Sequence, residues 1–419
     1  MEKLAIYGGK PLRDKPFPSK ALGPSLYGEE ELKELADVIN SKTPFRHYGE
    51  SKPYKVDELE KRLTAYIGTK FALAVSSGTA ALFCAIAALN IGPGDEVIIP
   101  ALSWYSLYSA VVGAGALPVF VDIDESLCID PAAFEKRINE KTKAVIALHL
   151  QGGCGNMDEI LRIARLRGVK VIEDFAQSFG GEYNGKKFGS MGDISIASFQ
   201  YNKMISCGEG GAVFTDNEEY FLRAVRYHDL GMMRQVFTRQ VDDKSLAEES
   251  HSFAGTQYRM SEIHGAVMLA QLEKLGNMLA KCRAYHKKMR DAFAGNARFG
   301  YRFQEGDCGI TFFMIFKTPA EAGRFNAALV AEGLSTGAVT GSKNLVKHYP
   351  VKSKKLVHDK LPPFGKGFDG EAYVYDVEAH CPNTDDIIGR CIAVTIGVQF
   401  TEEDIDDIIA GIKKVDANL

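Results

Sequence analysis

Short apolar runs alternate with amphipathic segments between residue 70 and about residue 215. Apolar runs of this length are typical of strands buried on both faces, and the segments between them have helical spacing. We expect strands at Phe71–Val75, Glu96–Pro100, Pro118–Asp122, Ala144–Leu150, Val169–Asp174, Ile194–Phe199 and Ala212–Thr215. We expect helices at Thr79–Asn90, Ser106–Gly113, Asp130–Ile138 and Met157–Arg167. This alternation predicts an α/β fold with a mostly parallel seven-stranded sheet that helices cover on both faces.

The pattern changes near Met260. An amphipathic stretch, Ser261–Leu275, runs into a second helical region, Met278–Phe293. An apolar run at Thr311–Phe316 and helical patterns at Ala320–Glu332 and Glu402–Val415 then predict a smaller C-terminal α+β domain.

The chain of 419 residues is therefore expected to divide into three parts. Residues 1–45 lack strand alternation and are expected to pack on the small domain or on a partner. Residues 46–295 form the large domain, and residues 296–419 form the small C-terminal domain.

The charge is nearly balanced: 50 basic and 54 acidic residues leave a formal net charge of −4, which predicts no whole-chain attraction for nucleic acid or an anionic membrane. Residues 1–20 lack the apolar core of a signal peptide, and no apolar run approaches the roughly 18 residues of a membrane span. We therefore expect a cytoplasmic protein. The eight cysteines form no CxxC pair and the nine histidines no HExxH pair, so no metal site is predicted.

Two short stretches are placed where α/β sheets bind ligands. Ser76-Ser77-Gly78-Thr79 follows a strand and opens a helix, where free backbone N–H groups and the helix dipole favour a phosphate, although an ordinary Ser/Thr cap is the alternative. Glu173-Asp174-Phe175-Ala176-Gln177 ends an apolar strand. A carboxylate at that edge can keep a pyridine nitrogen protonated, and the alternative is an aspartate that caps the next turn.

A third stretch, Ser198-Phe199-Gln200-Tyr201-Asn202-Lys203, is followed by Gly208-Glu209-Gly210-Gly211. A lysine beside glycine-rich backbone, between two apolar strands, can lose enough hydration to act as a Schiff-base amine. By itself, a lysine in such a loop is usually a solvated charge.

Taken together, the phosphate turn, strand-end aspartate, serine and lysine resemble the fold-type I enzymes that use pyridoxal 5'-phosphate (PLP). More narrowly, the chain is similar to the DegT/DnrJ/EryC1/StrS family of sugar aminotransferases. The similarity covers most of the chain, including Ala5–Pro11, Gly92–Pro100, Asp174–Gln177 and Ser198–Gly211. It implies the fold-type I architecture and PLP as the cofactor.

The resemblance also implies a role for each matching residue. Lys203 forms the internal aldimine and moves a proton between the substrate carbon and the cofactor C4′. Asp174 pairs with the pyridinium nitrogen, and Gln177 lies beside the ring. The phosphate is held by Gly78, Thr79 and Ser198.

Two further positions follow from the resemblance. Trp104 stands where family members stack an aromatic side chain on the ring, and a buried core aromatic is the alternative. The family usually has Asn where this chain has Gln257, and that residue reaches the phosphate in the other subunit. Gln keeps the amide donor and adds a methylene. Because this residue contacts the other subunit in the family, the resemblance implies a homodimer with shared active sites.

The implied reaction is transfer of an amino group from glutamate or glutamine to a sugar-like carbonyl, in amino-sugar, surface-polysaccharide or antibiotic biosynthesis. Related sugar dehydratases carry His at the lysine position, so Lys203 argues against dehydration. A catalytically silent binding module has no support, because every catalytic position is filled.

The acceptor has two interpretations. The stretches Thr43–Tyr48 and Ser206–Glu209, with Asn344 and His348, are similar to the transaminase that makes 8-amino-3,8-dideoxy-manno-octulosonate. Cys381–Asp385 resembles instead the 3-amino-5-hydroxybenzoate synthases and the inosose aminotransferases.

An acidic octulosonate requires a cation near the substrate. The candidates are Arg46, Lys343 and Lys347, which are otherwise solvated surface charges. His149, at a strand end, either contacts the cofactor or substrate or is a core histidine.

Overall fold

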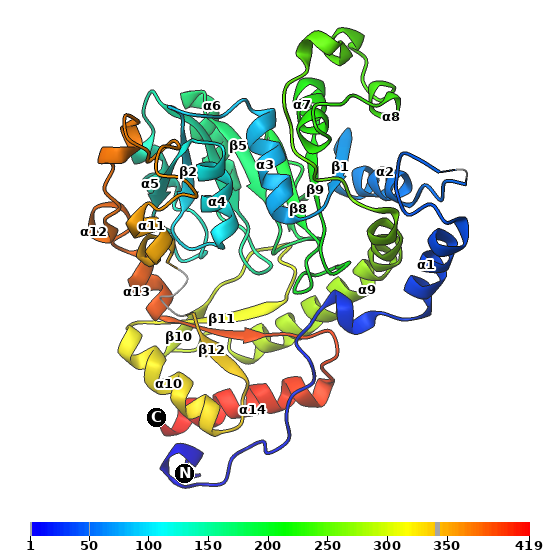
Figure 1. The fold of residues 1–419 in the computed structure, drawn as a ribbon. Coiled ribbons are helices and arrows are strands. Elements are labelled where there is room, and N and C mark those ends of the chain that lie inside the picture. The colour runs from blue at the N-terminus through cyan, green and yellow to red at the C-terminus, as the bar shows by residue number, and fades with distance from the viewer. Residues whose placement is uncertain (1, 50, 340–343) are drawn as a thin grey trace.

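The computed structural model describes residues 2–49, 51–339 and 344–419, and a large and a small sheet organise them (Figure 1). The strands of the large sheet are β1 (Phe71–Val75), β2 (Glu96–Pro100), β3 (Leu117–Val121), β4 (Thr142–Leu148), β5 (Lys170–Asp174), β8 (Ile194–Ser198) and β9 (Gly211–Thr215). They lie in the order β1-β9-β8-β5-β4-β2-β3. β9 runs antiparallel to both neighbours, and the other strands run parallel to one another. The predicted mostly parallel seven-stranded sheet is confirmed.

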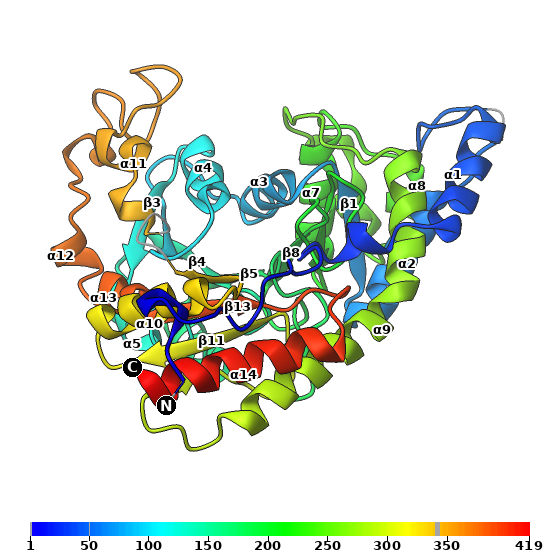
Figure 2. The same ribbon diagram turned by 90° about the horizontal axis from the view of Figure 1, so that it is seen from below.

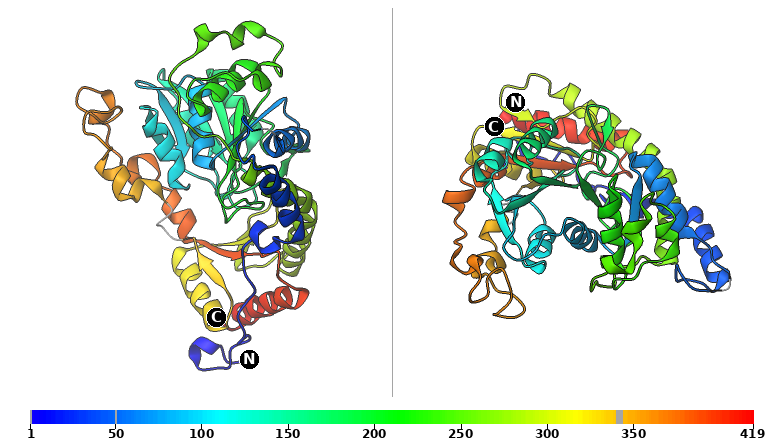
Figure 3. Two further views of the ribbon diagram at one scale, coloured as in Figure 1. Left: turned by 45° about the vertical axis from the view of Figure 1, so that its right-hand side comes forward. Right: turned by 90° about the horizontal axis from the view of Figure 1, so that it is seen from above.

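Helices cover both faces of this sheet, as the views in Figure 3 show. One face packs against α3 (Gly78–Ala88), α4 (Tyr105–Gly113) and α7 (Glu218–His228). The other packs against α2 (Lys55–Ile67), α5 (Pro131–Arg137), α6 (Met157–Arg167) and α9 (Glu262–Ala292). Because both faces are buried, the strands are apolar almost throughout, which is why they could be identified in the sequence.

The small sheet contains β10 (Phe299–Tyr301), β11 (Thr311–Phe316), β12 (Thr336–Ala338) and β13 (Cys391–Thr395). It is antiparallel, in the order β10-β11-β13-β12, and packs with α10 (Pro319–Ala331) and α14 (Glu402–Asn418). The predicted α+β architecture is confirmed, whereas the boundaries at residues 45 and 295 stay predictions. The two helical regions expected after Met260 form one continuous helix, α9.

The N-terminal segment runs along the small domain before it reaches the large one (Figure 2). Arg13 forms ion pairs with Asp404 and Asp407 of α14, each at 2.7 Å. Glu332 accepts hydrogen bonds from the backbone N–H groups of Ala5 at 2.8 Å and Leu12 at 3.0 Å. The chain then forms α1 (Glu29–Ser41), which packs against α9.

Between β12 and β13 the chain makes a long excursion that includes α11 (Tyr349–Ser353), α12 (Val377–His380) and α13 (Thr384–Gly389). Its start is attached to the large sheet by a hydrogen bond of 2.8 Å from Leu345 N to Ala101 O. Its end is fixed by Asp122, whose Oδ1 accepts from Asn383 N at 3.1 Å and from Thr384 N at 2.8 Å. Other short elements are β6 (Glu182–Tyr183), β7 (Lys186–Lys187) and α8 (Gln235–Thr238).

Within these described ranges, no helix combines the length and the apolar character needed to cross a bilayer. Across the same part of the chain, no group of three or more His, Cys, Asp or Glu side chains is arranged to hold a metal ion.

Candidate active site

Sheet register brings two of the predicted stretches together. Asp174 is paired with Ile196 on the parallel strand β8, and Ser198 lies two residues further along. Side chains two residues apart point to the same face of a strand, so Ser198 shares the face of Asp174. That face is the one covered by α3, whose first turn also reaches Ser198.

The first turn of α3 has the geometry of an anion site. A Cβ added to Gly78 would lie 2.6 Å from Ser198 Cβ and 2.9 Å from Ser198 Oγ, so the backbone of α3 lies directly against this serine. Ser77 caps the helix through its side chain, which accepts from Ala80 N at 3.0 Å. The N–H groups of Gly78 and Thr79 open the helix, where the dipole favours an anion. The Ser/Thr cap is therefore present, and binding of a phosphate at the same turn stays a prediction.

Asp174 is suited to a cationic partner. Its side chain is 2% exposed, and Oδ1 accepts one hydrogen bond, from Ala176 N at 3.0 Å. Burial raises the pKa of Asp174 to about 6, and the nearby positive charge of Lys203 opposes part of that rise. A buried carboxylate with so little compensation favours a cation placed against it. The protonated ring nitrogen of PLP is such a cation.

Lys203 lies on the turn that connects β8 to β9 (residues 199–210). Hydrogen bonds across its base, Tyr201 N to Gly208 O and Cys207 N to Phe199 O, both at 3.0 Å, close this turn. The lysine is partly buried, and burial lowers the pKa of its amine, against the attraction of Asp174. A lowered pKa increases the share of uncharged amine, which is the nucleophilic form.

Gln177 and Trp104 differ in how firmly the structure holds them. The carbonyl of Gln177 accepts a hydrogen bond from Gly152 N at 3.1 Å, and its side chain is partly buried. Trp104 stands just before α4 and is 69% exposed. The alternative that Trp104 is a buried core aromatic is wrong. An exposed indole is available to stack on a ring, so this role of Trp104 stays a prediction.

His149 is a core histidine. It follows β4 directly, and its Nε2 lies 2.9 Å from Oε1 of Glu173. Glu173 and Asp174 are neighbours on one strand, so their side chains point to opposite faces of the sheet. His149 therefore contacts the face away from Asp174, and its complete burial supports the core-histidine alternative rather than contact with cofactor or substrate.

Glu173 received no role in the sequence analysis. Its two oxygens also accept from the backbone N–H groups of Gly189 at 2.6 Å, Met191 at 2.9 Å and Gly192 at 3.1 Å. Burial opposes ionisation, but these bonds and His149 outweigh it and lower the pKa of Glu173. An acidic residue within an apolar strand was the available sequence signal for this buried anchor.

Arg46 is neither a solvated charge nor an acceptor-binding cation. Its side chain is buried, donates to Asp57 Oδ1 at 2.8 Å and to Glu60 Oε1 at 2.7 Å, and packs over the ring of Phe237. Two carboxylates from α2 therefore hold this guanidinium in the protein interior. A buried arginine of this kind is expected to be paired, which explains why it does not face the substrate side.

Of the remaining predicted residues, Lys347 and Gln257 are exposed. Lys347 is half exposed and forms an ion pair with Asp385, so much of its charge is balanced within the chain. Lys343 lies outside the described residues. Gln257 is exposed and bridges to Asp229 through the backbone. Asp229 itself is held between Arg234 and Arg259.

Known proteins place the chain in one family. A sequence model described as the DegT/DnrJ/EryC1/StrS aminotransferase family matches residues 26–413. The spore coat polysaccharide biosynthesis protein SpsC of Bacillus subtilis is 32% identical over 93% of this chain and 95% of that protein. The L-glutamine:scyllo-inosose aminotransferase of Streptomyces griseus is 36% identical over 66% of this chain, and the match spans 65% of that relative's length.

Solved structures agree on the fold. The crystal structure of 3-amino-5-hydroxybenzoic acid synthase covers 97% of this chain and 100% of its own, with a TM-score of 0.78 and 24% sequence identity. At 24% identity the structural likeness supports the fold alone. The family model, by contrast, matches the sequence of residues 26–413. The chain therefore belongs to the DegT/DnrJ/EryC1/StrS aminotransferase family and is a PLP-dependent aminotransferase.

Proposed function

We propose that this enzyme transfers the amino group of glutamine or glutamate to the carbonyl of a sugar or a sugar-like cyclic polyol. The observation that carries the proposal is the meeting of Asp174, Ser198 and the first turn of α3 on one face of the sheet, with the Lys203 turn beside them. The Streptomyces griseus relative, named for L-glutamine and scyllo-inosose, supports both the donor and a polyol acceptor.

Different residues are proposed to bind different parts of the cofactor. When bound, PLP would supply an aldehyde carbon that takes up the amino group and a ring that withdraws electrons. Asp174 holds the ring nitrogen in its protonated form, and Gln177 lies beside the ring. Ser198 and the N–H groups of Gly78 and Thr79 would hold the phosphate, and Trp104 would stack on the ring. Lys203 Nζ, whose pKa burial lowers, accepts and returns the proton at the substrate carbon.

The type of acceptor is inferred from the charges available to bind it. The interpretation of the acceptor as an acidic octulosonate-type sugar relied on three candidate cations. Of these, Arg46 is buried between carboxylates and Lys347 is paired with Asp385. Those pairings weaken the electrostatic argument for an acidic acceptor, and the inosose relative favours a neutral one. Both types, together with the 3-amino-5-hydroxybenzoate precursor class, therefore belong in one screen.

Separate half-reactions test donor and acceptor. We expect glutamine or glutamate to convert the yellow enzyme to its pyridoxamine form, and a keto sugar or inosose to restore the original absorbance. The measurement is the visible spectrum after each addition, with mass analysis of the sugar product. Lys203→Ala treated in the same way is the control. A sugar product that has lost water and gained no nitrogen would show a dehydratase and overturn the proposal.

We also propose that two chains share their active sites, with Gln257 reaching the phosphate in the partner subunit. Gln257 is exposed, and its backbone is held in place by the bridge to Asp229, so its amide is free to contact a second chain. Its extra methylene, compared with the Asn usual in the family, adds reach rather than removing the donor.

Mixed dimers test this arrangement. Lys203→Ala and Gln257→Ala chains should each have low activity, but dimers formed from both contain one intact site per pair. After unfolding and refolding together, we expect about a quarter of wild-type activity, since half of the dimers are mixed and each has one of two sites. Activity no higher than the sum of the two separate variants would contradict shared sites.

A further inference from the structure

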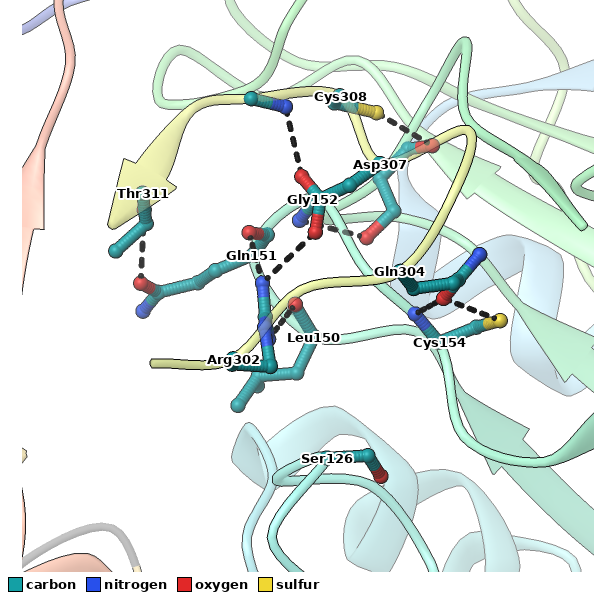
Figure 4. A network of polar contacts seen from close by, with 12 residues as sticks. Ser126, Leu150, Gln151, Gly152, Cys154, Arg302, Gln304, Asp307, Cys308 and Thr311 are labelled. Atoms are coloured by element: carbon teal, nitrogen blue, oxygen red, sulfur yellow. Dashed lines mark hydrogen bonds and ion pairs between the residues drawn. The ribbon is translucent and has the colours of Figure 1, made fainter. Parts of the chain in front are cut away.

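A turn of the small domain lies against the loop that follows β4 (Figure 4). We call residues 302–309, between β10 and β11, the anchor turn, and residues 149–154 the β4 loop. The β4 loop begins beside the candidate site, because the N–H of His149 donates to the carbonyl of Asp174 at 2.8 Å. The contact between anchor turn and β4 loop therefore joins the small sheet to the strand ends that carry the site.

Arg302 is the central side chain of this contact. Its guanidinium donates to the carbonyl of Leu150 at 2.7 Å and to that of Gln151 at 2.9 Å. It also forms an ion pair of 3.3 Å with Asp307 and lies over the ring of Phe313 at 4.5 Å. Arg302 is 6% exposed, so these bonds form away from water. A planar fork that holds two successive carbonyls fixes the local direction of the backbone.

The β4 loop adopts an unusual backbone in order to meet Arg302. Gln151 has a φ of +42° although it is not glycine, and its Oε1 accepts from Thr311 Oγ1 at 3.3 Å. Gly152 has a φ of +100°, and a Cβ added there would lie 2.8 Å from Asp307 Oδ1. Left-handed backbone at a non-glycine residue persists only where its surroundings hold it. Arg302, Thr311 and Asp307 are those surroundings, and all belong to the small domain or its edge.

The β4 loop in turn holds the segment that contains Gln177. The N–H of Gly152 lies within hydrogen-bonding distance of Gln177 O at 3.1 Å and of Ser178 Oγ at 2.9 Å. Ser178 Oγ donates to His149 O at 3.0 Å, and Cys308 N of the anchor turn donates to Gly152 O at 2.9 Å. Gly152 therefore connects the anchor turn on one side to Gln177 on the other.

We propose that Arg302 is a positioning residue of the transamination site, which acts through the β4 loop to hold Gln177 beside the cofactor. The inference rests on the proposed contact between Gln177 and PLP. Arg302 lies in the small domain, and its hydrogen bonds to the β4 loop go to backbone carbonyls. The small domain thereby sets the geometry of a residue that belongs to the large one.

The test uses Arg302→Met and Arg302→Lys, with Arg298→Met as the matched control. Arg298 precedes β10 and pairs with Asp416 of α14 at 2.8 Å, so it belongs to the same domain without touching the β4 loop. Hydrogen exchange of the full chain, with and without PLP, reports on residues 149–154 and 175–179. The pH midpoint of the visible absorbance, measured without substrate, reports on the ring environment.

We expect Arg302→Met to accelerate exchange in both segments by about tenfold or more, and to shift the absorbance midpoint by about half a pH unit. Arg302→Lys, which keeps the charge without the planar fork, should fold and show an intermediate shift. Arg298→Met should leave both readouts at their wild-type values. Faster exchange confined to the small domain, with an unchanged midpoint in both Arg302 variants, would show a purely structural role and overturn the proposal.

A double variant tests whether Arg302 affects the ring environment through Gln177. If Arg302 acts through Gln177, the midpoint of Arg302→Lys with Gln177→Ala should equal that of Gln177→Ala alone, because the two changes remove the same interaction. Additive shifts would mean that Arg302 reaches the ring by another path, which contradicts the proposal. If the protein failed to bind PLP at all, the proposed cofactor contact would fall, while the exchange experiment would still report the coupling between the domains.

Discussion

Replacement of Lys203 by alanine should lower turnover by about three to six orders of magnitude, because it removes the group that bonds the cofactor and moves the substrate proton. The turn that carries the lysine is closed by backbone hydrogen bonds that do not involve the side chain, so the fold should survive. PLP should still bind through Asp174, Ser198 and α3, but without the absorbance of lysine-bound cofactor. Steady-state turnover and the visible spectrum measure both effects.

Chemical labelling identifies the lysine independently of turnover. Borohydride reduction of the wild-type holoenzyme should attach the cofactor to a peptide that contains Lys203, and mass spectrometry locates the attachment. Lys187→Ala is the matched control, since Lys187 pairs with Glu182 at 2.7 Å on the β6–β7 hairpin and has no place in the proposed site. A Lys203→Ala enzyme with near-normal turnover, or a label on another lysine, would refute the central assignment.

Replacement of Asp174 by asparagine should change activity and stability in opposite directions. Activity should fall by about 10²–10³-fold, because asparagine cannot keep the ring nitrogen protonated. The cofactor-free protein should become more stable at pH 8. The pKa of Asp174 is raised by burial from the ordinary 3.8 to about 6, so its ionised form destabilises the folded state.

The raised pKa of Asp174 determines how the stability of the fold depends on pH. A carboxyl whose pKa is higher in the folded protein stabilises folding fully below about pH 4, and the stabilisation is lost as the pH rises through 6. Wild-type protein without cofactor should therefore lose about 2–3 kcal/mol relative to Asp174→Asn between pH 4 and pH 8. Denaturant unfolding of both proteins at several pH values measures the difference.

Glu173→Gln is the matched control, because Glu173 is the neighbouring buried carboxylate and its pKa is lowered. Its contribution has the opposite sign, since ionised Glu173 stabilises the fold above its ordinary pKa and loses that effect as the pH falls. The Gln variant should therefore be less stable than wild type at pH 8. A wild-type protein whose stability relative to Asp174→Asn does not change with pH would contradict the raised pKa of Asp174.

The central sheet was predictable because burial on both faces makes its strands apolar. β1 and β2 have the bounds expected from sequence, and the other strands of the large sheet differ by one or two residues at their ends. α1, α2 and α7 were not predicted, although α2 shows the helical spacing of Val56, Leu59, Leu63 and Ile67, all buried. The amphipathic pattern of α2 is therefore a helix signal that the sequence does contain.

The site residues likewise include some that lie in short sequence motifs and others whose environment depends on long-range contacts. Lys203, Asp174, Ser198 and Gly78 stand in short motifs that each allow a structural alternative, and their roles were predicted from the order of these motifs and the family resemblance. The environment of His149 depends on the register between β4 and β5, and the pairing of Arg46 depends on how α2 folds back over it. Neither relation is visible in a linear sequence. Arg302 is further removed, because its partners Leu150 and Gln151 lie about 150 residues earlier in the chain.

The closed turn between β8 and β9 has a consequence for cofactor retention. Both of its ends are fixed in adjacent strands, and backbone hydrogen bonds close it, so the amine that is proposed to bind the cofactor would stay near it after release. An amine tethered in this way has an effective molarity far above any free lysine in solution. In its proposed role Lys203 would therefore rebind the cofactor readily at the end of each turnover, in competition with escape of PLP into solvent.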